Sequence, residues 1–338
     1  MIIKFTDDIS LDKLKIGNKA KSLIDLKKNG FNVPDGFVVD ANIYFDIIKD
    51  NKIDKKINRL LEKLDNVEKV SKEILSLFDG IKVSKEIENS ILKNVNDKKL
   101  YAVRSSGTKE DMESHSFAGQ YVTHLNVKKS EIINRIIDCY KSMFSEVILN
   151  YIKNNNINVD DYGMAVVVQE MCDAKYSGIC FTCDPINGTD RQMLIEVGEG
   201  LGENIVSGQN KPEQYYYNWY DEEASFDDSN KYINKENLIK YAKVFFDIHY
   251  FYGYPCDIEF AIKDDKLFIL QARRITKIKY QGYKELWSTA DFKDGGVSAT
   301  ICYPYMWSLY EYIWEYTLRK FILDSKILTT KEIPNKLR

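Results

Sequence analysis

The sequence contains no long hydrophobic run, no block of basic residues and no linker rich in proline or glycine. No stretch approaches the ~20 apolar residues that a membrane-spanning helix needs. Lysine-rich stretches alternate with acidic residues, and the formal net charge is -3, so we expect neither a membrane nor nucleic acid as a partner. Residues 1–10 lack the apolar core of a signal peptide, which predicts a cytoplasmic protein.

Histidine and cysteine are also scarce. The three histidines support no Ser-His-Asp or Cys-His arrangement, and the six scattered cysteines are expected to be free thiols. Cys180 and Cys183 have the spacing of a redox or zinc motif, but the chain has no second pair of this kind, so we assign neither chemistry. Residues 198–202 are rich in glycine but match neither a dinucleotide fingerprint nor a Walker loop.

The 338 residues are too many for one ordinary core, which predicts two or three lobes. Apolar periodicity predicts helices over residues 20–28 and 238–252 and within 52–96. Short strands are predicted at residues 100–104, 164–168, 178–182, 193–197, 215–218, 258–262 and 267–270. This pattern indicates an α+β or mixed α/β fold, and α+β is our prediction. A tail rich in tryptophan and tyrosine follows, with a predicted helix at 306–321.

Two carboxylates alternate along one predicted strand. Asp257 and Glu259 share a face, because alternate residues of a strand point the same way. Gln271 and Arg273 repeat this spacing on the next strand. With a two-residue turn Glu259 pairs with Leu270 and the two polar sets lie on opposite faces, whereas a three-residue turn places Glu259 opposite Gln271. We predict this second, convergent register.

The convergent register would suit a magnesium–nucleotide complex. Mg²⁺ takes carboxylate or amide oxygens together with phosphate oxygens, and an arginine beside it can hold a phosphate. The alternative is an exposed strand face that carries ordinary charges.

Three other segments could surround a phosphate. Arg104 ends a predicted strand before small hydroxylated residues, residues 116–120 form a loop of small residues, and Lys19 lies in a glycine-containing loop that opens a helix. Each signal is weak by itself, because a surface arginine before a turn, or one lysine among many, also explains it.

Five ordered segments together resemble the N-terminal ATP-binding domain of phosphoenolpyruvate synthase, pyruvate phosphate dikinase and rifampicin phosphotransferase. The resemblance runs from about residue 14 to 277, and its segments are residues 16–39, 101–127, 166–185, 196–208, and 257–262 with 267–276. It implies an ATP-grasp-type fold, in which two lobes hold the nucleotide, followed by a C-terminal helical tail. The implied division is a first lobe with a helical insert at 1–166, a second lobe with the metal site at 167–277, and the start of a further helical domain at 278–338.

The same resemblance implies roles for individual residues, with ATP and Mg²⁺ as the cofactors. Lys19, Arg104 and Arg273 are the implied catalytic residues, which contact the phosphates. The nucleotide-binding set adds a loop over the triphosphate and a hinge at the adenine edge: Ser116, Ala118, Gly119, Gln120, Gln169, Glu170 and Met171. The implied metal ligands are two side chains and a candidate third: Glu259, Gln271 and Asp257.

Two positions depart from the family pattern without bearing against ATP binding. Asn18 precedes Lys19 where the family often has glycine, and Arg274 stands where proline is common.

A larger departure is that the family's phosphohistidine motif is absent. Enzymes of this family pass phosphate from ATP, with release of AMP, to a histidine on another domain and then to an acceptor. His115, His124 and His249 do not match the histidine motif; His115 lies in the loop over the triphosphate, where a surface position is the simpler explanation. We therefore expect a phosphohistidine domain and an acceptor domain as partners, in a longer chain or on another subunit.

The tail resembles the start of the acceptor domain in the rifampicin phosphotransferase architecture. Its aromatic helix would lie uncovered, which favours a truncated product. The predicted function is the ATP-binding module of a dikinase-type phosphotransferase whose final small-molecule acceptor is pyruvate. The alternatives are a rifampicin phosphotransferase-like or other small-molecule kinase, a ligase that releases ADP, and a non-catalytic nucleotide-binding regulator.

Overall fold

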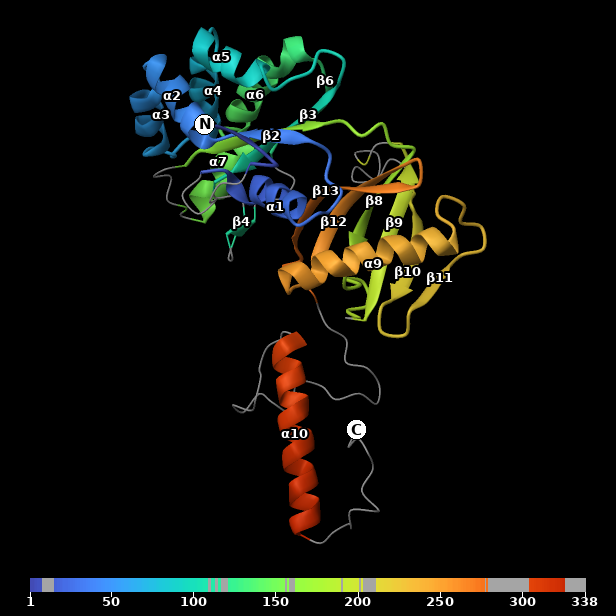
Figure 1. Cartoon of the computed structure of the whole chain (residues 1–338). Coiled ribbons are helices and arrows are strands. Elements are labelled where there is room, and N and C mark those ends of the chain that lie inside the picture. The colour runs from blue at the N-terminus through green and yellow to red at the C-terminus, as the bar shows by residue number, and fades with distance from the viewer. Residues whose placement is uncertain are drawn as a thin grey trace.

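The computed structural model describes residues 1–7, 15–108, 111–112, 115–116, 121–155, 157, 162–189, 191–200, 202, 211–276, 278 and 304–325. Within these residues the strands form two large antiparallel sheets and one short pair (Figure 1). Helices cover the outer face of the first sheet, and one long helix crosses a face of the second (Figure 1). The predicted α+β fold with two lobes is confirmed.

The first lobe is built on a sheet with the strand order β1-β2-β7-β3-β6. These strands are β1 (Ile2–Lys4), β2 (Gly36–Val39), β7 (Met164–Glu170), β3 (Tyr101–Gly107) and β6 (Thr123–Val127). The outer helices are α2 (Ala41–Asp50), α3 (Asp54–Leu61), α4 (Val67–Leu77), α5 (Lys85–Leu92), α6 (Ile132–Ser142) and α7 (Glu146–Asn154), with a 3-10 turn, η1, at Lys129–Glu131. Their apolar faces and one face of the sheet enclose the first hydrophobic core.

The second lobe is built on a sheet with the order β11-β10-β9-β8-β12-β13. These strands are β11 (Glu223–Phe226), β10 (Glu213–Asn218), β9 (Gln192–Glu199), β8 (Tyr176–Phe181), β12 (Cys256–Lys263) and β13 (Lys266–Arg274). The short separate pair is β4 (Asp111–Met112) with β5 (His115–Ser116).

Helix α9 (Lys235–Tyr252) covers one face of the second sheet (Figure 1). Its buried residues recur at the spacing of a single helix face: Leu238, Tyr241, Ala242, Phe245 and Ile248. The side chain of Asn234 caps the first turn by accepting from the N–H of Asn237, and Gly253 ends the helix in the left-handed conformation, with φ 70°. The predicted helix at 238–252 is therefore confirmed, with one more turn at its start.

Helix α1 (Gly17–Lys28) belongs to the first lobe in sequence but packs between the lobes (Figure 1). Its buried face, which includes Leu23 and Ile24, joins the second hydrophobic core together with α9 and the second sheet. The first sheet contributes to the same core through alternate residues of β7, Ala165 and Val167. The second lobe therefore packs against α1 and the inner face of the first sheet.

Strand β7 is the last strand of the first sheet, and the chain changes sheets between Glu170 and Tyr176. The predicted domain boundary between residues 166 and 167 therefore falls inside β7. The sequence prediction lacked strands β1, β2, β4, β5, β6 and β11 and helices α2, α6 and α7. Each of these strands has five residues or fewer, so few residues are available to show an alternating pattern.

The C-terminal helix α10 (Pro304–Asp324) contains the predicted helix at 306–321. In Figure 1 it lies apart from both lobes, and many of its apolar side chains are exposed, including Tyr312, Trp314 and Phe321. None of the helices that the structure describes is long and apolar enough to cross a membrane.

Gly17 tests the packing of α1 against β3. Its φ is +71°, and a Cβ atom there would lie 2.6 Å from the carbonyl oxygen of Gly107. We expect Gly17→Ala to lower the free energy of unfolding by about 3 kcal/mol, because left-handed strain adds to the steric overlap. Urea denaturation followed by circular dichroism measures this change.

Gly30 provides the matched control. Its φ is +83°, but nothing lies within 4 Å of the position of a Cβ atom. Gly30→Ala should therefore show only the backbone strain, about 1 kcal/mol. Equal losses for the two variants would contradict the close approach of α1 to β3.

Candidate functional site

The hairpin of β12 and β13 determines which polar groups face the first lobe. Its turn has two residues, Asp264 and Asp265, both with positive φ, so the three-residue turn that we predicted is wrong. A β-bulge between Glu259 and Phe260 nevertheless restores the convergent register. Glu259 pairs with Gln271 while Phe260 pairs with Ile269, so one extra residue, 270, lies on β13. The predicted pairing of Glu259 with Gln271 is confirmed.

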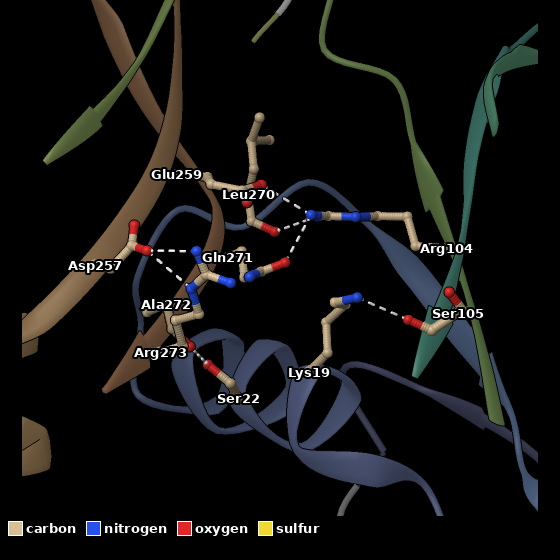
Figure 2. A network of polar contacts seen from close by, with 10 residues as sticks. All are labelled: Lys19, Ser22, Arg104, Ser105, Asp257, Glu259, Leu270, Gln271, Ala272 and Arg273. Atoms are coloured by element: carbon tan, nitrogen blue, oxygen red, sulfur yellow. Dashed lines mark hydrogen bonds and ion pairs between the residues drawn. The ribbon is translucent and has the colours of Figure 1, made fainter. Parts of the chain in front are cut away.

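The bulge also turns the carbonyl group of Leu270 towards Arg104 (Figure 2). Arg104 Nη1 donates to the Leu270 oxygen at 2.8 Å. Its Nη2 donates to Glu259 Oε2 at 2.8 Å and to Gln271 Oε1 at 2.7 Å. The guanidinium of one lobe thus joins three acceptors of the other, and two of these are predicted metal ligands.

Burial makes this connection energetically important. Arg104 is 8% exposed, and its Nε has no hydrogen-bond partner among the described residues. Removing one partner from a buried charge pair costs about 3–5 kcal/mol, because the other charge is left uncompensated. A buried donor without a partner is rare in folded proteins and indicates a place where an acceptor from a ligand or water can bind.

Lys19 is brought to the same site by the start of α1. This helix has no side-chain cap at its own N-terminus; instead the hydroxyl of Ser106, on β3, accepts from the N–H of Ala20 at 3.1 Å and donates to the carbonyl of Ile16 at 2.7 Å. Lys19 Nζ then donates to the carbonyl oxygen of Ser105 at 2.8 Å (Figure 2). The ammonium group of Lys19 and the guanidinium of Arg104 therefore lie on one side of the interlobe space.

Asp257 and Arg273 form a separate ion pair across the hairpin. Arg273 donates through Nε at 2.8 Å and through Nη2 at 2.6 Å, both to Asp257 Oδ2 (Figure 2). Burial raises the pKa of the Asp257 carboxyl above its ordinary value, and the Arg273 guanidinium opposes this rise without cancelling it. Asp257 is committed to Arg273 in this arrangement, in contrast to Glu259, which faces Arg104.

Helix α1 also fixes the hairpin by direct hydrogen bonds. Ser22 Oγ donates to the carbonyl oxygen of Ala272 at 2.8 Å. Just after α1, Asn32 Nδ2 donates to the carbonyl oxygen of Leu267 at 2.7 Å, and the backbone carbonyl oxygen of Asn32 accepts from the N–H of Ile269 at 2.9 Å. These positioning residues could not be predicted from the sequence, because a serine within a helix, or an asparagine just after one, gives no signal of a distant partner.

The predicted hinge has its backbone donors already occupied. The N–H of Glu170 donates to the Asp35 oxygen at 2.8 Å, and that of Met171 donates to the Leu100 oxygen at 2.9 Å. The Glu170 carboxylate pairs with Lys99 Nζ at 2.6 Å. Gln169 differs from both, because its side chain is buried and its Nε2 has no partner among the described residues.

The structure describes only part of the predicted loop over the triphosphate. Ser116 lies in β5, where it pairs with Asp111, whereas Ala118, Gly119 and Gln120 lie outside the described residues. Two histidines are engaged in other contacts. His249 Nδ1 lies 2.9 Å from Thr182 Oγ1, and His124 Nε2 lies 3.8 Å from Asp138 Oδ2.

The cluster therefore gathers six of the predicted site residues at the interface of the lobes: Lys19, Arg104, Asp257, Glu259, Gln271 and Arg273 (Figure 2). Its cationic groups suit phosphate oxygens. The donor set also fits a hard cation: Glu259 Oε2 and Gln271 Oε1 converge on one positively charged nitrogen, Arg104 Nη2. Among the described residues, no group of three or more His, Cys, Asp or Glu side chains could hold a metal ion.

Comparison with known proteins shows which sequences this chain is similar to. A family profile described as "Pyruvate phosphate dikinase, AMP/ATP-binding domain" matches residues 13–226 and 219–290. The chain is 33% identical over 287 residues to the "Uncharacterized phosphotransferase YvkC" of Bacillus subtilis. The aligned region covers 78% of this chain and 33% of that protein. The chain is 32% identical over 319 residues to the probable phosphoenolpyruvate synthase of Methanothermobacter thermautotrophicus, covering 82% and 46% of the two chains.

A third relative carries a different name. The chain is 29% identical over 297 residues to the rifampicin phosphotransferase of Bacillus cereus. The aligned region covers 78% of this chain and 34% of that protein. The chain thus spans between 33% and 46% of the length of these three relatives.

The raised pKa of Asp257 predicts a pH dependence of stability. The folded chain binds the Asp257 proton more tightly than the unfolded chain does. The free energy of unfolding therefore falls as pH rises from the ordinary carboxyl pKa of 3.8 through the higher pKa of the folded state. Asp257→Asn does not titrate but keeps an acceptor for Arg273. We therefore expect the melting temperature of the variant, relative to the unchanged protein, to rise with pH over that window.

Asp227 supplies a control of opposite sign. Hydrogen bonds from Ser229 lower the pKa of this exposed carboxyl, so its contribution to stability is present above the ordinary value and lost below it. The relative melting temperature of Asp227→Asn should fall as pH rises. A constant difference between Asp257→Asn and the unchanged protein across the pH series would refute the raised pKa.

Proposed function

The chain belongs to the family of the pyruvate phosphate dikinase AMP/ATP-binding domain, and on this premise we propose that it binds ATP between its two lobes as the ATP-binding part of a dikinase-type phosphotransferase. The family's ATP-grasp-type arrangement agrees with the two sheets and the polar interface between them. The observation that carries the proposal is the buried guanidinium of Arg104, which faces Glu259 and Gln271 across the lobes.

The proposed phosphate contacts are Lys19, Arg104 and Arg273. Their nitrogens point into one interlobe space from α1, β3 and β13, so a triphosphate there would meet positive charge from both lobes (Figure 2). Arg104 has a planar fork that matches phosphate oxygens, and its buried Nε still lacks a partner among the described residues. Catalysis of phosphoryl transfer depends mainly on such positioning and charge stabilisation.

Glu259 and Gln271 are the proposed ligands of Mg²⁺. When bound, the ion would offset the negative charge of the phosphates. This assignment is supported by the position of Arg104 Nη2, a positively charged nitrogen that lies 2.8 Å from Glu259 Oε2 and 2.7 Å from Gln271 Oε1. Nucleotide binding would then release Arg104 from these two oxygens to the phosphates. We leave Asp257 out of direct ligation, because its carboxylate oxygen Oδ2 accepts both hydrogen bonds from Arg273.

The remaining proposed parts surround the nucleotide. Residues 116–120, with Ser116, Ala118, Gly119 and Gln120, would close over the triphosphate. Gln169, Glu170 and Met171 would border the base.

We further propose that a histidine on another domain takes the phosphoryl group and AMP leaves. Pyruvate is the proposed final acceptor, which is supported by the name of the relative from Methanothermobacter thermautotrophicus. A rifamycin is the second candidate, supported by the relative from Bacillus cereus.

The first test measures ATP binding. We expect isothermal titration calorimetry with MgCl₂ to detect ATP binding by the purified chain, and Arg104→Met to weaken it by about thirtyfold or more, since a charged hydrogen-bonding partner of the phosphates is lost. Arg135→Met is the matched control, because Arg135 pairs with Asp138 on the helical surface of the first lobe. Unchanged affinity in Arg104→Met, with a folded protein by circular dichroism, would rule out the proposed site.

The second test identifies the products. The chain alone should release neither AMP nor ADP from ATP, whereas addition of a phosphohistidine domain from a complete family enzyme should produce AMP. Separation of the nucleotides by anion-exchange chromatography distinguishes the two products, and Lys19→Ala should abolish AMP formation in the mixture. ADP as the product would instead favour a ligase, and AMP without any added domain would contradict the division of labour.

A further inference from the structure

We propose that Arg104 keeps free divalent cations out of the interlobe site until a nucleotide displaces its guanidinium, so that the chain takes up Mg²⁺ only together with ATP or after it. This inference rests on the proposed binding of ATP between the lobes and concerns the regulation of that same site. Arg104 then acts as an internal, displaceable cation in addition to its proposed contact with the phosphates.

One guanidinium engages three oxygens of the second lobe. Arg104 Nη2 donates to Glu259 Oε2 at 2.8 Å and to Gln271 Oε1 at 2.7 Å (Figure 2). Its Nη1 donates to the carbonyl oxygen of Leu270 at 2.8 Å. A carboxylate, a carboxamide and a backbone carbonyl are also the kinds of oxygen that bind a hard divalent cation. The same three oxygens can therefore serve either the arginine or a metal ion.

The metal ion and the guanidinium exclude each other by charge. Mg²⁺ binds oxygen at about 2.1 Å, so an ion that bridged Glu259 and Gln271 would lie no more than about 5 Å from Arg104 Nη2. Arg104 and Gln271 are 8% and 5% exposed, so little water is present to screen the repulsion. The guanidinium in this position therefore lowers the affinity of the site for any free divalent cation.

The rest of the cluster does not compensate for a second cation. Three cationic side chains, Lys19, Arg104 and Arg273, face two carboxylates, those of Asp257 and Glu259 (Figure 2). The net charge of these five groups is +1 even when both carboxylates are ionised. Arg273 also engages Asp257 Oδ2 through two hydrogen bonds, at 2.8 and 2.6 Å. Such a cluster attracts a triphosphate and repels a free cation.

A nucleotide changes this balance in two ways. Phosphate oxygens are strong acceptors for a guanidinium, and Arg104 Nε is a buried donor without a hydrogen-bond partner among the described residues. Transfer of the guanidinium to the phosphates frees the oxygens of Glu259 and Gln271, and the phosphates add the negative charge that a divalent ion requires. By linkage, the nucleotide raises the affinity for metal by the same factor by which metal raises the affinity for nucleotide.

The test measures cation binding without nucleotide. Mn²⁺ is the probe, because electron paramagnetic resonance reports the concentration of free Mn²⁺ during a titration. We expect Arg104→Met to bind Mn²⁺ at least about tenfold more tightly than the unchanged protein, because the guanidinium no longer competes for the oxygens. Circular dichroism verifies that the variant is folded.

Three further variants locate the effect. Arg104→Lys keeps a positive charge at this position, so its Mn²⁺ affinity should stay close to that of the unchanged protein. Arg104→Met combined with Glu259→Gln lacks the carboxylate and should lose the gained binding. Arg135→Met removes an arginine that pairs with Asp138 on the helical surface of the first lobe, so it should leave Mn²⁺ affinity unchanged.

A measurement on the unchanged protein needs no substitution. MnCl₂ alone should leave its melting temperature unchanged, whereas MnCl₂ with ATP should raise it, because a bound ligand stabilises the folded chain. A rise with MnCl₂ alone, or equal Mn²⁺ affinities of the unchanged protein and Arg104→Met, would overturn the inference while ATP binding stands. If MnCl₂ with ATP gives no rise and calorimetry detects no ATP binding, the proposed function fails and this inference fails with it.

Discussion

The guanidinium of Arg104 is a charge that the first lobe buries and the second lobe neutralises. It leaves β3 on the inner face of the first sheet, is 8% exposed, and finds its acceptors on Leu270, Glu259 and Gln271. An isolated buried charge is very unfavourable, so the closed arrangement of the lobes and the charge state of the interface depend on each other. Any ligand that enters between the lobes must replace these acceptors with others of similar strength, and phosphate oxygens can do so.

The other features of the site serve this connection. The bulge at residue 270 both restores the register of Glu259 with Gln271 and aims a carbonyl group at Arg104. The Ser106 hydroxyl caps α1 from β3, which brings Lys19 beside the strand that carries Arg104. Ser22 and Asn32 hold the hairpin of β12 and β13 against the first lobe by donating hydrogen bonds to carbonyl oxygens of β13. The lobes are therefore joined by polar contacts at the site itself, where a ligand can alter them.

The polar groups of the site could be predicted from the sequence, whereas most of their contacts could not. Alternation along strands was sufficient to place Asp257 with Glu259 and Gln271 with Arg273, because the period of a strand is a local property. The turn length was wrong and the register right, since a bulge adds a residue that no count of the turn reveals. Local sequence also could not show that the N–H groups of Glu170 and Met171 are taken by Asp35 and Leu100, which lie far away in the chain.

The sequence by itself determined the family, the two-lobed α+β class and the identity of the charged residues, because these follow from ordered motifs and from local periodicity. Only the tertiary structure decided which charges meet. Arg104 faces Glu259 and Gln271, Arg273 holds Asp257, and Gln169 keeps a buried donor without a described partner. These outcomes depend on long-range register, burial and the approach of α1, and each is set by the packing of residues that are distant in sequence.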